Sequence, residues 1–110
     1  MEKYIMTLTI NEIKDIITPI CKRYDVTAAY LFGSYARGDC TTSSDVDIRV
    51  DCGKSNKLKG LFGVSGLRLD LEDALKKSVD LLTWIPSGES SKYFRDNMLR
   101  DEVLIYGDKK

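Results

Sequence analysis

The chain has 110 residues, of which 43% are hydrophobic and 31% are charged, and its 17 basic side chains balance its 17 acidic ones. This size and composition are typical of a soluble globular domain whose core needs no disulfide. We therefore expect one domain over residues 1–110 and, without a basic excess, no direct binding of nucleic acid. Histidine is absent, which excludes Ser-His-Asp and Cys-His nucleophile systems, histidine-ligated zinc and a histidine general base.

The N-terminal part of the sequence predicts a helix followed by a central strand. Thr9 and Glu12 have the spacing of a capping box, in which each side chain accepts a hydrogen bond from a free N–H group at the helix start. Apolar residues then recur at helical spacing, which predicts one helix to about Arg23 with a bend at Pro19. Residues 26–32 are nearly all apolar. They predict a strand that is covered on both faces and lies inside its sheet.

A turn, a polar loop and a second strand follow. We expect a short helical turn over residues 34–38 and a loop over residues 39–44. Residues 45–51 alternate strictly between charged and apolar side chains, which predicts a strand with one face on the core and one facing a cleft or solvent. The core face consists of Val46, Ile48 and Val50, and the charged face of Asp45, Asp47, Arg49 and Asp51.

The C-terminal half predicts two helices and one further strand. We expect a mobile loop with at most a helical turn over residues 52–65, and a helix over residues 66–77. A strand over residues 79–84 and a last helix that ends near Arg100 follow. Residues 103–106 suit a short extended segment. The order α-β-β-α-β-α predicts an α/β or α+β architecture in which helices pack against one small sheet.

Two short motifs have a spacing that suits phosphate and metal chemistry. Gly33 and Ser34 end the buried strand, where glycine lets a ligand approach the backbone and successive N–H groups bind anions. The same pair is also a common turn signal. Asp45 and Asp47 project from one face of the second strand, close enough to share a divalent cation, although a solvated strand face has the same pattern. The combination arises by chance in about one such chain in a thousand.

A third carboxylate, Asp80, lies within the apolar strand predicted over residues 79–84. Burying a charge in such a strand is costly unless a partner offsets the loss of hydration. The partner is either a bound metal ion or a neighbouring arginine or lysine, and the sequence leaves both alternatives open.

The segments Gly33–Asp39 and Ser44–Ile48 resemble the signature of the DNA-polymerase-β-like nucleotidyltransferase superfamily. More narrowly, the chain is similar to the minimal nucleotidyltransferases, the antitoxins that pair with HEPN-domain toxins. The likeness extends over most of the chain and is most specific from Leu31 to Asp47. It implies the fold of that superfamily, a small mixed sheet with helices packed against it.

The resemblance also implies an activity, a cofactor and a role for each motif. It implies transfer of a nucleoside monophosphate, expected to be AMP from ATP, with the help of two Mg²⁺ ions. The implied catalytic and metal-binding residues are Asp45, Asp47 and Asp80, of which Asp80 also helps to activate the attacking hydroxyl. The implied phosphate-binding residues are Gly33 and Ser34, whereas Arg37 contacts either a phosphate or the partner, or is a solvated side chain.

The resemblance also implies an acceptor for the transferred group. In the family that the chain resembles, the acceptor is a tyrosine of the cognate HEPN toxin, an RNase that adenylylation silences. We therefore expect an adenylyltransferase that acts as an antitoxin in a hetero-oligomer with this partner. One alternative is transfer to a small molecule such as an aminoglycoside, although no segment for an acidic acceptor pocket is apparent. Another is a non-catalytic antitoxin that masks its partner, against which the complete carboxylate set argues.

Further features concern location and surface. No apolar run is long enough to span a membrane, and the N-terminus lacks the apolar core of a signal peptide, so we expect a cytoplasmic protein without a membrane partner. The three cysteines lack C-x-x-C spacing, which predicts free thiols. Apolar candidates for a partner surface, each of a type found more often in the core, are Leu61, Phe62, Tyr93 and Phe94.

Overall fold

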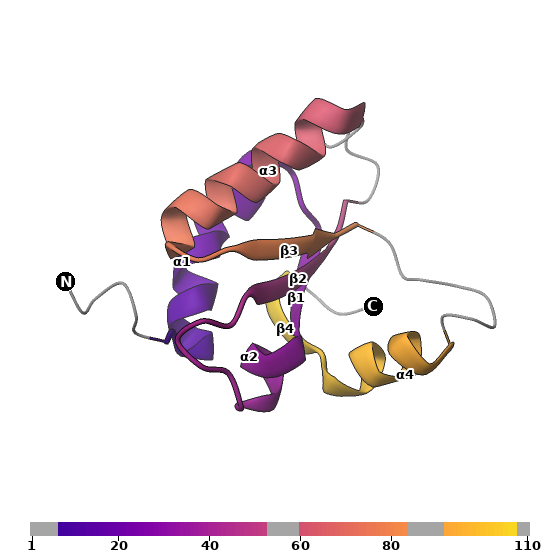
Figure 1. Ribbon diagram of the computed structural model, residues 1–110. Helices are drawn as coiled ribbons and strands as arrows, with labels where there is room; N and C mark the ends of the chain where they lie inside the picture. The colour runs from indigo at the N-terminus through magenta and orange to yellow at the C-terminus, as the bar shows by residue number, and fades with distance from the viewer. Residues whose placement is uncertain (1–6, 53–59, 84–91, 108–110) are drawn as a thin grey trace.

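The computed structural model describes residues 7–52, 60–83 and 92–107, in which helices and strands alternate along the chain (Figure 1). The helices are α1 (Ile10–Arg23), α2 (Gly33–Arg37), α3 (Gly60–Leu75) and α4 (Lys92–Asp101). The strands are β1 (Ala28–Phe32), β2 (Val46–Asp51), β3 (Val79–Leu82) and β4 (Val103–Gly107). The predicted class, helices packed against one small sheet, is confirmed.

One mixed sheet organises these elements, with the strand order β3-β2-β1-β4. β1 is antiparallel to β2 and to β4, whereas β2 and β3 run parallel. Every residue of β1 is buried, so the prediction of a central strand covered on both faces is confirmed. β4 is the segment that the sequence suggested only as a short extended piece, and it completes the sheet beside β1.

The hydrophobic core lies between one face of the sheet and the helices α1 and α3 (Figure 1). Helix α1 begins at the predicted capping box, because the Glu12 amide donates to the Thr9 hydroxyl at 3.0 Å and the Thr9 amide donates to the Glu12 carboxylate at 2.8 Å. Pro19 lies inside α1, which continues past it to Arg23 as predicted. The largest fully buried side chains are Ile13, Ile17, Leu31, Ile48, Leu67 and Leu71.

Helix α3 begins at Gly60, so the prediction of a loop up to residue 65 is wrong for its last part. Glycine inside a helix costs roughly 1 kcal/mol relative to alanine. Packing of Leu67, Leu71 and Leu75 on the core offsets this cost, and Gly66 also leaves room for the Tyr24 side chain. A Cβ added at Gly66 would lie 3.1 Å from the Tyr24 hydroxyl, which donates to Asp70 at 2.6 Å and joins α1 to α3.

Arg49 corrects the predicted charged face of β2. The alternation placed this side chain toward a cleft or solvent, but Arg49 is only 5% exposed. Its guanidinium donates to Glu102 at 2.8 Å and to Asp51 at 3.1 Å, and it lies 4.3 Å from the centre of the Tyr30 ring. Two carboxylates and an aromatic face therefore compensate for part of the lost hydration, whereas the buried Nε atom has no hydrogen-bond partner among the described residues. Glu102 is distant in sequence, so periodicity within β2 could not indicate this contact.

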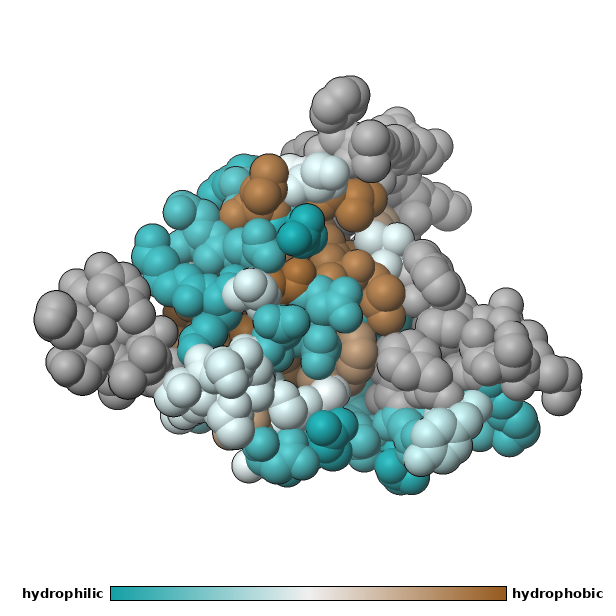
Figure 2. Space-filling model, viewed as in Figure 1, coloured by the Kyte–Doolittle hydropathy of each residue, from teal (hydrophilic) through white to brown (hydrophobic). Residues whose placement is uncertain are grey.

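On the face of the molecule seen in Figure 2, apolar side chains gather over β3 and hydrophilic side chains surround them. Tyr93, one of the predicted partner-surface residues, is 83% exposed, whereas the side chains of Leu61, Phe62 and Phe94 lie outside the described part of the structure. Within the described residues, no helix is both long and apolar enough to cross a lipid bilayer.

Candidate active site

The sheet face opposite the core carries a row of three residues in register. Phe32, the last residue of β1, lies opposite Asp47 in β2, and Asp47 lies opposite Asp80 in β3. Side chains directly opposite each other on neighbouring strands point to the same face of a sheet. The parallel pairing of β2 and β3 therefore brings together two carboxylates that are distant in sequence.

This row forms the floor of a pocket of about 390 Å³, a volume suited to a small ligand. The pocket is also lined by residues of two helices, namely Gly33, Ser34 and Arg37 of α2 and Asn97 and Asp101 of α4. Every predicted site residue except Asp45 lines this pocket.

The turn from β1 into α2 requires glycine at position 33. Gly33 has a φ of +72°, a conformation that residues with a side chain rarely adopt. A Cβ at this position would also collide with the Asp47 carboxylate. Glycine therefore lets the start of α2 lie directly against Asp47, with the Ser34 side chain lining the same pocket.

Asp47 carries an unfavourable charge. Partial burial, together with the negative charges of Asp80 and Asp45, raises its pKa to about 6, although Arg37 opposes the shift. Among the residues that the structure describes, no group donates a hydrogen bond to Asp47 or Asp80. A divalent cation bound between these two carboxylates would remove their repulsion, and carboxylate oxygens are ligands that Mg²⁺ prefers. The pocket therefore fits such a cation.

Asp45 is the predicted ligand that the structure leaves outside the pocket lining. It is exposed and immediately precedes β2, yet it is close enough to Asp47 for its charge to raise that residue's pKa. In the described ranges, no three acidic, cysteine or histidine side chains form a group that could hold a metal ion. Two carboxylates supplemented by ligand phosphates are a common Mg²⁺ site, so the role of Asp45 as a ligand stays a prediction.

Asp80 differs from the sequence prediction in its surroundings. It is exposed, because β3 is the outermost strand on its side of the described sheet. The burial cost that the sequence suggested therefore does not arise. Within the described residues, no lysine or arginine forms an ion pair with Asp80, which disfavours the structural alternative and leaves its carboxylate available at the pocket.

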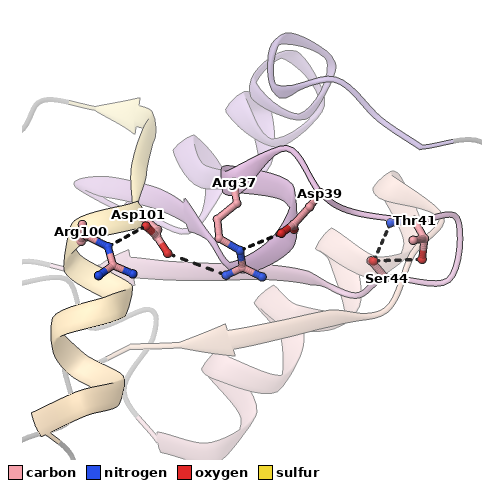
Figure 3. Close-up of polar contacts among 6 residues, drawn as sticks. All are labelled: Arg37, Asp39, Thr41, Ser44, Arg100 and Asp101. Carbon is pink, nitrogen blue, oxygen red and sulfur yellow. Dashed lines mark hydrogen bonds and ion pairs between the residues drawn. The ribbon is translucent and has the colours of Figure 1, made fainter.

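Arg37 lies between two carboxylates at the pocket wall (Figure 3). Its Nε donates to Asp39 at 3.2 Å, and its Nη1 lies 3.8 Å from Asp101, which also accepts from Arg100 at 3.3 Å. The Arg37 side chain is 47% exposed, and such ion pairs contribute little free energy. Exchange of one of these carboxylates for a ligand phosphate is therefore inexpensive.

The pocket residues that the sequence did not predict are Asn97 and Asp101. Both come from α4, and neither belongs to a motif that indicates chemistry. The last residue of α4 reaches the pocket only because β4 pairs with β1, which places the end of the helix beside α2 (Figure 3). The wall therefore depends on long-range pairing that periodicity does not reveal.

Comparison with known proteins identifies the family. Residues 14–110 match the family described as polymerase beta nucleotidyltransferase. The chain belongs to this family. The nucleotidyltransferase is 43% identical over 98 residues to a candidate protein adenylyltransferase of Methanocaldococcus jannaschii, with 89% of this chain and 99% of the relative covered. It is also 35% identical over 85 residues to the protein adenylyltransferase MntA of Thermococcus cleftensis. This match covers 66% of this chain and 86% of the relative.

A solved structure supports the fold of this nucleotidyltransferase. This protein matches one chain of a solved structure, the complex of a tri-AMPylated HEPN toxin with an MNT antitoxin from Shewanella oneidensis. The TM-score is 0.62 and the sequence identity is 19%. The match covers 91% of this chain and 74% of the other. The resemblance to minimal nucleotidyltransferases that the sequence suggested is thus confirmed at the level of family and fold.

Proposed function

We propose that this nucleotidyltransferase transfers AMP from ATP to a tyrosine hydroxyl of an HEPN-type RNase and thereby acts as the antitoxin of that partner. The observation that carries the proposal is the pair of Asp47 and Asp80 in register, facing the Gly33 turn within one pocket. Two findings support AMP as the transferred group and a protein as its acceptor. Both relatives are named as protein adenylyltransferases, and the toxin in the Shewanella complex is AMPylated.

Mg²⁺ is the proposed cofactor, and Asp47 and Asp80 would hold it, with Asp45 as a further predicted ligand of a second ion. When bound, Mg²⁺ supplies Lewis-acid stabilisation of the negative charge on the phosphoryl oxygens and on the leaving pyrophosphate. The Asp47 carboxylate has no hydrogen-bond donor among the described residues and so remains free for this role.

The residues of the chain position the triphosphate and the acceptor. Gly33 allows phosphate oxygens to approach the backbone, the Ser34 hydroxyl donates to one of them, and the Arg37 guanidinium offsets their charge. The tyrosine oxygen then forms a bond to the α-phosphorus while the bond to pyrophosphate breaks. Asp80, exposed at the edge of the sheet, accepts the proton that leaves the tyrosine hydroxyl. Positioning and electrostatics thus provide most of the catalysis.

The position of the label in ATP tests this proposal directly. We expect the purified protein, incubated with Mg²⁺, ATP and a lysate of the source cells, to attach label from the α-phosphate to one protein and to attach none from the γ-phosphate. Transfer of γ-label would mean kinase chemistry, and α-label on a small molecule would favour the small-molecule alternative. Stable capture of a partner without any transfer would favour masking.

Replacement of Gly33 by alanine tests the phosphate turn. We expect Gly33→Ala to lower transfer at least about tenfold, because the new Cβ displaces the Asp47 carboxylate, and one tenfold step corresponds to only about 1.4 kcal/mol. Gly38→Ala is the matched control, since Gly38 has a φ of +87° and nothing within 4 Å of an added Cβ. Both variants bear backbone strain of roughly 1–2 kcal/mol. Equal losses of activity in steady-state assays would refute the close approach of Gly33 and Asp47 as the cause.

A further inference from the structure

We infer that Asn97 of α4 recognises the base of the bound nucleotide by accepting a hydrogen bond from the exocyclic amine of adenine. The inference rests on the proposed function, because it takes ATP as the ligand of the pocket. It concerns a part of the pocket to which neither the sequence motifs nor the family resemblance assigns a role.

The pocket lining divides into a charged part and a neutral part. The Gly33 turn and Arg37 suit phosphates, and Asp47 and Asp80 suit a cation. Asp101 is already engaged with two arginines (Figure 3). What remains is Asn97 together with Phe32. A nucleobase is an uncharged, flat ligand with hydrogen-bonding edges, so a carboxamide and an aromatic side chain are the parts of this lining that match it.

The Asn97 side chain is available for a ligand. It is partly buried at the pocket wall, and among the described residues it makes no hydrogen bond. Its carboxamide oxygen accepts hydrogen bonds, so it can take one from the exocyclic amine of adenine. A polar group that has lost part of its hydration without a partner in the protein gains most from a hydrogen bond with the ligand.

The geometry of α4 gives Asn97 a suitable distance from the phosphates. Asn97 and Asp101 are four residues apart, so they lie on one face of the helix about 6 Å apart along its axis. The contact of Asp101 with Arg37 at 3.8 Å fixes the end of this face beside the phosphate turn. Asn97 therefore lies about one helical turn from the phosphate end, a separation comparable with the ribose that joins base and phosphates.

A cycle that changes protein and ligand together tests this inference without any acceptor protein. The dissociation constants of a non-hydrolysable ATP analogue and of the matching purine riboside analogue, which lacks the exocyclic amine, are measured by calorimetry with Mg²⁺ for wild type and Asn97→Ala. We expect Asn97→Ala to weaken binding of the ATP analogue roughly fivefold to tenfold, the usual effect of one hydrogen bond. The same substitution should leave the purine riboside analogue within about twofold of wild type.

Two controls separate the outcomes. Leu99→Ala changes a side chain on the same helix that is 41% exposed and outside the pocket lining, and it should leave both constants unchanged. Inorganic tripolyphosphate should bind wild type and Asn97→Ala equally. Equal weakening of both nucleotide analogues, or weaker binding of tripolyphosphate, would overturn the inference and assign Asn97 to the ribose or the phosphates. Absence of nucleotide binding by wild type would instead refute the proposed function, and the inference with it.

Discussion

Replacing Asp47 with asparagine is expected to abolish AMP transfer and, at the same time, to stabilise the metal-free protein. Asp47 is the proposed metal ligand at the centre of the in-register row, and loss of metal-assisted charge stabilisation is worth several kcal/mol, which corresponds to a roughly 10³-fold lower kcat/KM. The opposite effect on stability follows from the raised pKa. The ionised Asp47 carboxylate is less favourable in the folded protein than in the unfolded chain.

The pH dependence of this stabilisation has a defined direction. Because folding raises the Asp47 pKa from 3.8 to about 6, ionisation of Asp47 opposes folding fully above that value and not at all below the unfolded pKa. After allowance for solvent screening of a partly exposed group, we expect Asp47→Asn to be more stable than wild type by about 1 kcal/mol at pH 7. The difference should disappear as the pH falls from about 6 to about 4.

Thermal unfolding in EDTA at several pH values, with transfer assays on the same samples, measures both effects. A gain of about 1 kcal/mol corresponds to a rise of a few degrees in Tm for a domain of this size. Added Mg²⁺ and ATP should raise the Tm of wild type more than that of Asp47→Asn. A variant that keeps transfer would refute the role of Asp47 in catalysis, and a variant less stable than wild type at pH 7 would refute the unfavourable charge.

Removal of the Glu102 side chain is expected to have the largest effect on stability. In the pair of Arg49 and Glu102 the side chains are only 6% and 10% exposed. Breaking such a buried pair leaves an uncompensated charge and typically costs about 3–5 kcal/mol. Asp51→Ala is the matched control, because Asp51 contacts the same guanidinium at 3.1 Å but its side chain is 48% exposed. Its loss should cost no more than about 1 kcal/mol.

Chemical denaturation of Glu102→Ala, Asp51→Ala and the double variant Arg49→Met/Glu102→Leu distinguishes pairing from packing. We expect the double variant to recover most of the stability lost in Glu102→Ala, since an apolar pair of similar volume often replaces a buried ion pair without loss. Similar losses for Glu102→Ala and Asp51→Ala would show that the burial of Glu102 does not determine the energy of the contact.

Features encoded by neighbouring residues were predictable from the sequence. The Thr9–Glu12 capping box, the buried strand before Gly33 and the apolar face of β2 each depend on residues within one element, and each is confirmed. The start of α3 was not predictable in this way. Glycines that disfavour a helix are tolerated there because packing on α1, for which Gly66 leaves room beside Tyr24, outweighs local propensity.

The candidate site was predictable only in part, because its geometry is not local. The motif spacing and the family resemblance selected Asp47 and Asp80, but the parallel register that places them opposite each other is a property of the sheet. Burial of Arg49 and the contribution of α4 to the pocket arise from contacts between distant segments. Periodicity within one element contains no information about such contacts. The position of Asn97 at the pocket is therefore apparent only from the structure.

The position of Asp80 on an outer strand has a consequence for the size of the acceptor. Asp80 is exposed, and beyond β3 the described sheet has no further strand, so within the described structure one side of the proposed reacting centre borders solvent. An acceptor that approaches from this side need not fit inside the pocket as a whole, because only the side chain that bears the hydroxyl must reach the phosphate. A folded macromolecule with one protruding tyrosine therefore meets the same steric requirement as a molecule of a few atoms.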